Sequence, residues 1–174
     1  MPKSVPGGRV NLALIAIGRL KAGPERELSG RITSFFAALG RNLGVSAVDL
    51  VELPESRARR TADRRTEEAR ALLAELPSGA VLTAYDERGR SDLSSEALAE
   101  RFVCWRDGSR PGICTVIGGP DGLDESVRAR ADLVLGFGRA TLAHGLVRVL
   151  AFEQVYRTLT IVAGHPTIEA KLEQ

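Results

Sequence analysis

Three segments of the sequence place glycines or polar residues directly after apolar runs. These segments are Tyr85-Asp86, Gly118-Gly119-Pro120-Asp121-Gly122 and Gly136-Phe137-Gly138-Arg139. Glycines after strands let the backbone approach a ligand closely and expose its amide donors. Because ligands of open α/β sheets bind beyond the carboxyl ends of the strands, the three segments predict a single nucleotide-like site.

The type of nucleotide follows from what the glycine segments lack. Gly136-Phe137-Gly138 begins like a dinucleotide fingerprint, but Thr141 occupies the third glycine position. The segment also follows the fifth apolar run, whereas that fingerprint opens the first βαβ unit. No GxxxxGK[ST] phosphate loop occurs in the sequence. The pattern favours an adenosine-containing ligand held by backbone amides, and a nicotinamide-dependent oxidoreductase remains a rival reading.

The sequence offers few groups for metal chemistry. It holds two cysteines, Cys104 and Cys114, outside any CxxC pattern, and two histidines, His144 and His165. We therefore expect metal-free catalysis in a reducing, cytoplasmic compartment. No apolar stretch is long enough for a transmembrane helix, so no membrane association is expected.

The segment from Ala143 to Thr158 is predicted to form a long helix. Apolar residues cover more than half of its surface, which makes it a candidate dimer face. Arg148 and Arg157 lie nine residues apart on it, and we expect both to project in the same general direction. Two readings stay open for each arginine: contact with an RNA phosphate, or pairing with a nearby acid such as Glu153.

Charge is concentrated in one segment, although the net charge is only +2. Six arginines fall between Arg57 and Arg70, among three acids. Such a segment neutralises phosphates in some proteins, and in others it is the solvated start of a helix with Glu/Arg pairs. The two readings are equally supported by the sequence.

The elements that must position these residues alternate between strand and helix. Strands are expected over Val10–Ile17, Val45–Leu53, Ala80–Tyr85, Ile113–Ile117 and Asp132–Gly136, and helices over Pro24–Leu39, Thr61–Leu76, Ser94–Trp105, Asp124–Ala131 and Ala143–Thr158. Residues 86–89 are expected to form a turn. Continuous apolar strands separated by helices predict an α/β fold with a mainly parallel sheet covered on both faces. We expect one domain over residues 1–174, in which residues 1–8 form a disordered lead-in.

Three blocks of the last third of the chain have a specific resemblance. They are Ile117-Gly118-Gly119-Pro120-Asp121-Gly122-Leu123, Thr141-Leu142-Ala143-His144-Gly145-Leu146-Val147-Arg148-Val149-Leu150 and Glu153-Gln154-Val155-Tyr156-Arg157, followed by His165-Pro166. Together they resemble the RlmH family, SPOUT enzymes that methylate N3 of a pseudouridine in large-subunit ribosomal RNA.

The resemblance implies a trefoil-knotted fold, a homodimer whose interface builds the active site, and ribosomal RNA as the partner, within the ribosome. It further implies that S-adenosylmethionine is held by Tyr85, Asp86, Gly118, Gly119, Gly138, Arg139, Ala140, Thr141, Leu142 and Ala143. His144 is then the first candidate for the base that removes the N3 proton, and Asp86 is the second. Arg148, Arg157 and His165 are the candidate RNA-binding residues.

The chain departs from the family pattern at a few positions. Thr167-Ile168-Glu169 stand where the family has a Tyr-His-Arg tail, Tyr85 replaces a leucine, and Gly145 replaces a proline. The altered tail, within the divergent residues 165–174, motivates an alternative function: a catalytically altered member that binds cofactor or RNA, or that methylates a different RNA.

Overall fold

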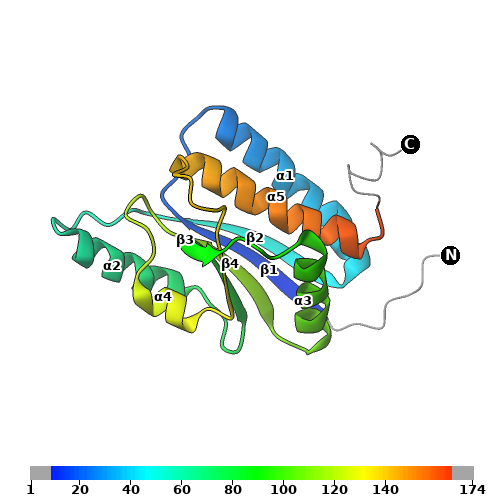
Figure 1. Cartoon of the computed structure of the whole chain (residues 1–174). Coiled ribbons are helices and arrows are strands. Elements are labelled where there is room, and N and C mark those ends of the chain that lie inside the picture. The colour runs from blue at the N-terminus through cyan, green and yellow to red at the C-terminus, as the bar shows by residue number, and fades with distance from the viewer. Residues whose placement is uncertain (1–8, 166–174) are drawn as a thin grey trace.

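The computed structural model describes residues 9–165. Within them a five-stranded sheet has the order β2-β1-β4-β3-β5, and every strand pair is parallel (Figure 1). The strands are β1 (Val10–Ile17), β2 (Val45–Leu53), β3 (Val81–Arg90), β4 (Gly112–Ile117) and β5 (Leu133–Leu135). The predicted parallel α/β fold is confirmed. The lead-in Met1–Gly8 and the tail Thr167-Ile168-Glu169 lie outside the described residues.

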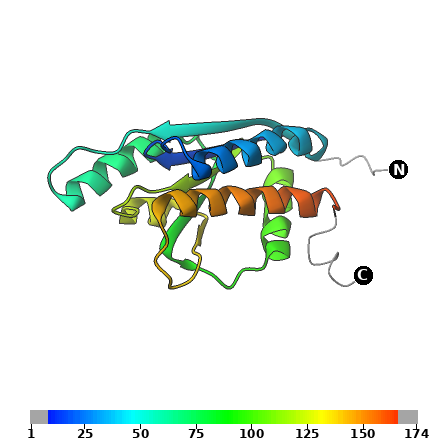
Figure 2. The same cartoon turned by 90° about the horizontal axis from the view of Figure 1, so that it is seen from above.

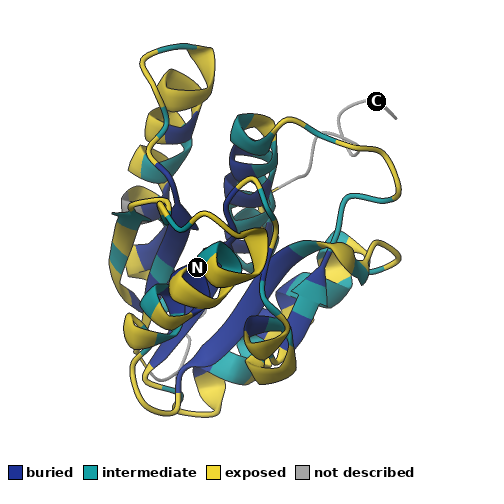
Figure 3. Cartoon of the chain, turned by 90° about the vertical axis from the view of Figure 1, so that its left-hand side faces the viewer, coloured by how far each residue is buried: buried dark blue, intermediate teal, exposed yellow. Residues whose placement is uncertain are grey.

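Helices cover both faces of the sheet. One face carries α1 (Pro24–Gly40), α3 (Ser95–Asp107) and α5 (His144–Val162), and the other carries α2 (Thr61–Ala74) and α4 (Glu125–Arg130) (Figures 1 and 2). A short 3-10 helix, η1 (Arg41–Leu43), joins α1 to β2. The pattern of burial follows these layers, with dark strands inside and exposed outer helix surfaces (Figure 3).

The alternation of side chains along β1 explains the two layers. Val10, Leu12 and Leu14 belong to the apolar cluster under α1, α3 and α5. Ile15 and Ile17 belong to the cluster under α2 and α4. Because successive residues of a strand point to opposite faces, a strand covered on both sides must be apolar throughout. The continuous apolar run Val10–Ile17 is therefore a strand buried on both faces, as predicted.

β3 departs from the sequence expectation at its carboxyl end. It was expected to stop at Tyr85, but it continues to Arg90. Both Tyr85 and Arg90 pair with Leu135, so residues 86–89 bulge out between them. The expected turn at residues 86–89 is thus a bulge within a longer strand. A Cβ on Gly89 would lie 2.2 Å from the carbonyl carbon of Leu135, so only glycine permits this crossing of backbones.

The two cysteines lie in contrasting surroundings. Cys104 is exposed on α3, whereas Cys114 is buried in β4, and both are free thiols. Burial raises the pKa of Cys114 to about 11. In residues 9–165 no helix combines the length and the apolar character needed to cross a bilayer.

Candidate functional site

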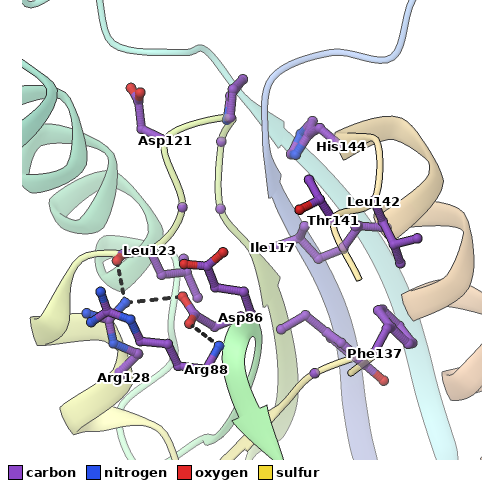
Figure 4. A pocket seen from close by; sticks show the side chains of 18 of the residues that line it. Asp86, Arg88, Ile117, Asp121, Leu123, Arg128, Phe137, Thr141, Leu142 and His144 are labelled. Carbon is purple, nitrogen blue, oxygen red and sulfur yellow. Dashed lines mark hydrogen bonds and ion pairs between the residues drawn. The ribbon is translucent and has the colours of Figure 1, made fainter. Parts of the chain in front are cut away.

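A cavity of about 460 Å³ lies beyond the carboxyl ends of β3, β4 and β5. Its volume is in the range of small-ligand sites. The residues predicted from the sequence converge there: Tyr85, Asp86, Gly118, Gly119, Gly138, Arg139, Ala140, Thr141, Leu142 and His144 all line it. Ala143 is the N-cap residue of α5, next to the lining. Figure 4 shows Asp121 and Arg128 on one side of the cavity and Leu142 and His144 on the other.

The loop between β5 and α5 presents free backbone donors. The N–H groups of residues 138–143 make no hydrogen bond within the described part of the chain. Helix α5 also begins without a side-chain cap, so the N–H groups of its first turn lack intrahelical partners. Gly138 has a φ of 88°, and a Cβ there would meet nothing within 4 Å. This open, donor-rich loop suits a ligand read by backbone contacts.

The glycines after β4 have a different role from the one expected. A Cβ on Gly118 would lie 2.9 Å from Leu123, and one on Gly119 would lie 2.9 Å from Glu68. Their missing side chains therefore make room for packing within the protein. Both glycines also line the cavity, and their contact with a ligand stays a prediction.

An aromatic pair forms part of the cavity wall. The rings of Tyr85 and Phe137 stack with centroids 5.1 Å apart and an interplanar angle of 14°. Burial raises the pKa of Tyr85, and the nearby Glu153 adds to this shift. The phenol is thus neutral, and the pair offers a flat, uncharged surface.

Asp86 lies in the cavity lining but is fully engaged. One carboxylate oxygen accepts the backbone N–H of Arg88 at 2.9 Å, and the other accepts from Nη1 of Arg128 at 3.1 Å (Figure 4). Its side chain is 4% exposed. These contacts fix the bulge at residues 86–89, which is a structural task rather than that of a free base.

His144 begins α5 and is half-buried. Its Nε2 lies 3.2 Å from the carbonyl oxygen of Ile17. Burial lowers the pKa of His144 from its ordinary value of 6.5, the contact with Ile17 opposes this shift, and the positive charge of Arg148 reinforces it. The ring is therefore neutral near pH 7. If Nε2 carries the proton donated to Ile17, Nδ1 is a free acceptor.

Arg148 is buried, whereas a residue that binds an RNA phosphate has to be exposed. Its side chain is 1% exposed, and Nη1 lies 2.7 Å from Glu52 Oε1. Nη2 donates to the carbonyl oxygens of Ile17 and Gly18 at 2.9 and 2.7 Å. Burial lowers the pKa of Arg148, and Glu52 opposes that shift. Arg148 ties the start of α5 to the ends of β1 and β2, so the expected phosphate contact is not available.

Arg157 and His165 also lie away from the cavity. Nine residues are about two and a half helical turns, so Arg148 and Arg157 project to opposite sides of α5, and the expected common direction was wrong. Arg157 pairs with Glu153 at 2.8 Å, the acid named as its alternative partner. His165 follows the carboxyl end of α5, a helix of 19 residues, so about 30 Å separates it from the cavity of its own chain.

An ion pair that the sequence did not reveal holds the glycine loop after β4. Arg64 of α2 lies 2.5 Å from Asp121, and its side-chain hydrogen bond lowers the pKa of that carboxyl group. Beneath the loop, the buried Glu68 accepts the Ser56 N–H at 3.0 Å, and burial raises its pKa. Arg64 and Asp121 are 57 positions apart, so no local spacing predicts their contact. One arginine of the basic segment, Arg64, thus stabilises the loop that lines the cavity.

No three His, Cys, Asp or Glu side chains within residues 9–165 come together as a metal site. The cavity lining combines glycine backbone, one imidazole, four guanidinium groups and the carboxylates of Asp86, Glu87 and Asp121.

The sequence of this chain is similar to those of known methyltransferases. Residues 10–167 match the model of a family described as predicted SPOUT methyltransferase. Relatives called ribosomal RNA large subunit methyltransferase H are 66% identical in Methylobacterium radiotolerans, 62% in Methylorubrum populi and 51% in Xanthobacter autotrophicus. Each alignment covers 90% of this chain and 96%, 95% and 98% of those relatives.

Among solved structures, the SpoU methyltransferase AviRb of Streptomyces viridochromogenes in complex with AdoMet aligns with a TM-score of 0.39 at 15% identity. That alignment covers 92% of this chain and 63% of the other.

Proposed function

The chain belongs to the SPOUT methyltransferase family, and from this premise we propose that it methylates large-subunit ribosomal RNA using S-adenosylmethionine. The observation that carries the proposal is the convergence of three strand-end segments on one cavity, in a chain 66% identical to a ribosomal RNA large subunit methyltransferase H. The specific target is N3 of a pseudouridine, as the RlmH resemblance implies.

The cavity suits S-adenosylmethionine in size and in chemistry. Residues 138–143 offer free N–H groups for the adenine edge, while Ile117, Leu142 and the Tyr85–Phe137 pair offer apolar surface. When bound, this cofactor supplies a methyl group that its positive sulfonium makes electrophilic. The protein then has to orient the target nitrogen and to handle its proton.

His144 is the residue best placed to take the N3 proton. It lines the cavity, it is neutral near pH 7, and its Nδ1 is an acceptor when Nε2 donates to Ile17. General-base catalysis needs this combination of reach and protonation state. Asp86 is the weaker candidate because its oxygens already accept two hydrogen bonds.

A homodimer and a trefoil knot complete the proposal. The RlmH resemblance implies an active site built at the interface, and such an interface would let His165 of one copy reach the cavity of another. The exposed apolar residues Leu28, Phe35 and Leu146 on α1 and α5 support a partner on that face. We propose that the protein acts on the ribosome in the cytoplasm.

The direct test is the transfer of labelled methyl from S-adenosylmethionine to ribosomes that lack the modification, followed by mass spectrometry of the RNA. Label on N3 of a large-subunit pseudouridine is expected. Cofactor binding without any label would favour the catalytically altered alternative that the Thr167-Ile168-Glu169 tail motivates. Label on another nucleotide would retain the enzyme and change its target.

A further inference from the structure

The mouth of the cavity carries more arginine than acid. Four arginines line it: Arg65, Arg88, Arg128 and Arg139. Arg128 is paired with Asp86, and the lining residue Asp121 is paired with Arg64. Within residues 9–165, this leaves three lining arginines without an ion pair and a single lining acid, Glu87, in the same condition. The surplus positive charge suits an anionic ligand. The amino and carboxylate groups of S-adenosylmethionine carry opposite charges, so they do not account for this surplus.

Arg65 has an unmet hydrogen-bonding need. It is half-buried on α2, and its buried Nε has no partner within the described residues. Its charge also contributes to lowering the pKa of Asp121, which already receives hydrogen bonds from Arg64. Arg65 thus stands in the cavity lining without an ion-pair partner among residues 9–165, and its guanidinium charge is available to a ligand of the cavity.

Arg88 and Arg139 approach the same cavity from two other segments. Arg88 lies on the bulge of β3, where its N–H is fixed by Asp86. Arg139 follows Gly138 in the loop before α5. Both side chains are exposed, and neither forms an ion pair among residues 9–165. Three separate segments thus place guanidinium groups around one opening.

We propose that Arg65, Arg88 and Arg139 form an arginine rim that binds the phosphodiester backbone of the RNA on either side of the target nucleotide. The inference rests on the proposed function, since it concerns the substrate of the same cavity. Guanidinium groups match phosphate oxygens in geometry and retain their charge at any working pH. Such contacts fix register and orientation and carry no base specificity. The rim takes the role that the buried Arg148 does not fill.

The test is the salt dependence of RNA binding by the full-length protein. The probe is the ribosome that lacks the modification, titrated at several salt concentrations with the wild type, three single Arg→Gln variants and the triple variant. Each lost phosphate contact lowers the slope of log affinity against log salt by about 0.7–0.9. Near 0.1 M salt this corresponds to roughly a fivefold to tenfold loss of affinity per arginine.

Arg41→Gln is the matched control. Arg41 is exposed on η1, at the opposite end of the sheet from the cavity, and forms no ion pair in the described part of the chain. Its substitution is expected to leave the slope unchanged. Calorimetric titration with S-adenosylmethionine gives a second readout, and Arg65→Gln and Arg88→Gln are expected to bind the cofactor as the wild type does.

The outcomes separate the rim from the proposed function. If the triple variant and Arg41→Gln show the same slope of log affinity against log salt, the rim is overturned, even if the wild type methylates ribosomes. The wild type could transfer no methyl group while each rim substitution still lowers the salt dependence of RNA binding. That result would contradict the methyltransferase function and support the rim. A wild type without affinity for these ribosomes would also overturn the rim.

Discussion

The two walls of the cavity are both held by arginine–carboxylate pairs, but the pairs differ in burial. On the α5 wall, formed by α5 with the ends of β1 and β2, Arg148 is 1% exposed and Glu52 is 19% exposed. On the α2 wall, formed by α2 with the loop after β4, Arg64 and Asp121 are 27% and 26% exposed. Water screens the second pair from both sides, but it reaches the first pair only through Glu52. One wall is therefore a fixed part of the fold, whereas the other can adjust.

Arg148→Met should have the largest effect, because it removes one partner of the buried pair. The carbonyl oxygens of Ile17 and Gly18 and the carboxylate of Glu52 would lose their donor. We expect the free energy of unfolding to fall by about 2–4 kcal/mol, somewhat less than for a fully buried pair because Glu52 reaches solvent. Urea unfolding at pH 7 measures this, with Arg157→Met as the control, expected within about 0.5 kcal/mol of the wild type. Equal losses in the two variants would mean that the buried pair of the α5 wall stabilises the fold no more than a partly exposed pair on the same helix.

Asp86→Asn tests the bulge that lies between the walls. Arg128 would lose its buried partner but keep Glu125 and the carbonyl oxygen of Leu123. A loss of about 1–2 kcal/mol in unfolding free energy is expected, with methyl transfer only modestly slower. A fall in the transfer rate by more than about 100-fold at unchanged stability would instead identify Asp86 as the base.

The pH dependence of stability probes His144 on the α5 wall. Because the folded chain lowers the pKa of His144 below 6.5, the unfolded chain binds this proton at higher pH than the folded chain does. The stabilisation is complete above pH 6.5 and is lost as the pH falls toward the folded pKa, with a slope of at most about 1.4 kcal/mol per pH unit. Denaturation at several pH values should show this slope in the wild type and not in His144→Gln. The acid limb of methyl transfer should also lie below pH 6.5.

Asp121→Asn should have the smallest effect, since it weakens an exposed pair on the α2 wall. We expect no change in global unfolding but faster amide exchange at Gly122, whose N–H bonds to Gly119 within the held loop. Added salt should accelerate the same amide in the wild type and not in the variant. A clear drop in global stability would mean that the α2 wall is as fixed as the α5 wall.

The sequence predicted the frame of the site well because its strands are unambiguous. The predicted limits of β1 and β2 are those of the structure, and the three strand-end segments meet in one cavity. A continuous apolar run in β1 and an alternating, valine-rich run in β2, ended by Gly18 and Pro54, permit few alternatives. The bulge of β3 was less predictable, because residues 86–89 carry turn-forming types and the return to pairing at Arg90 depends on Leu135.

The roles of individual charges could not be predicted, since they depend on distant partners. Arg148 and Glu52 are 96 positions apart, and Arg64 and Asp121 are 57 positions apart. An arginine on an amphipathic helix has the same sequence signature whether it contacts phosphate or a buried carboxylate. Helical geometry alone would have separated Arg148 from Arg157, because nine residues place them on opposite sides of α5.

The two thiols differ in exposure, so a thiol-directed reagent should label the protein at one cysteine. Thiolates react with maleimides and thiols do not, so the buried Cys114, whose pKa is about 11, is inert near neutral pH. Cys104 stands exposed on α3, so a fluorescent maleimide would attach at one known position without any substitution. Chains carrying donor and acceptor dyes would then report association between copies through energy transfer, in a protein whose sequence is otherwise untouched.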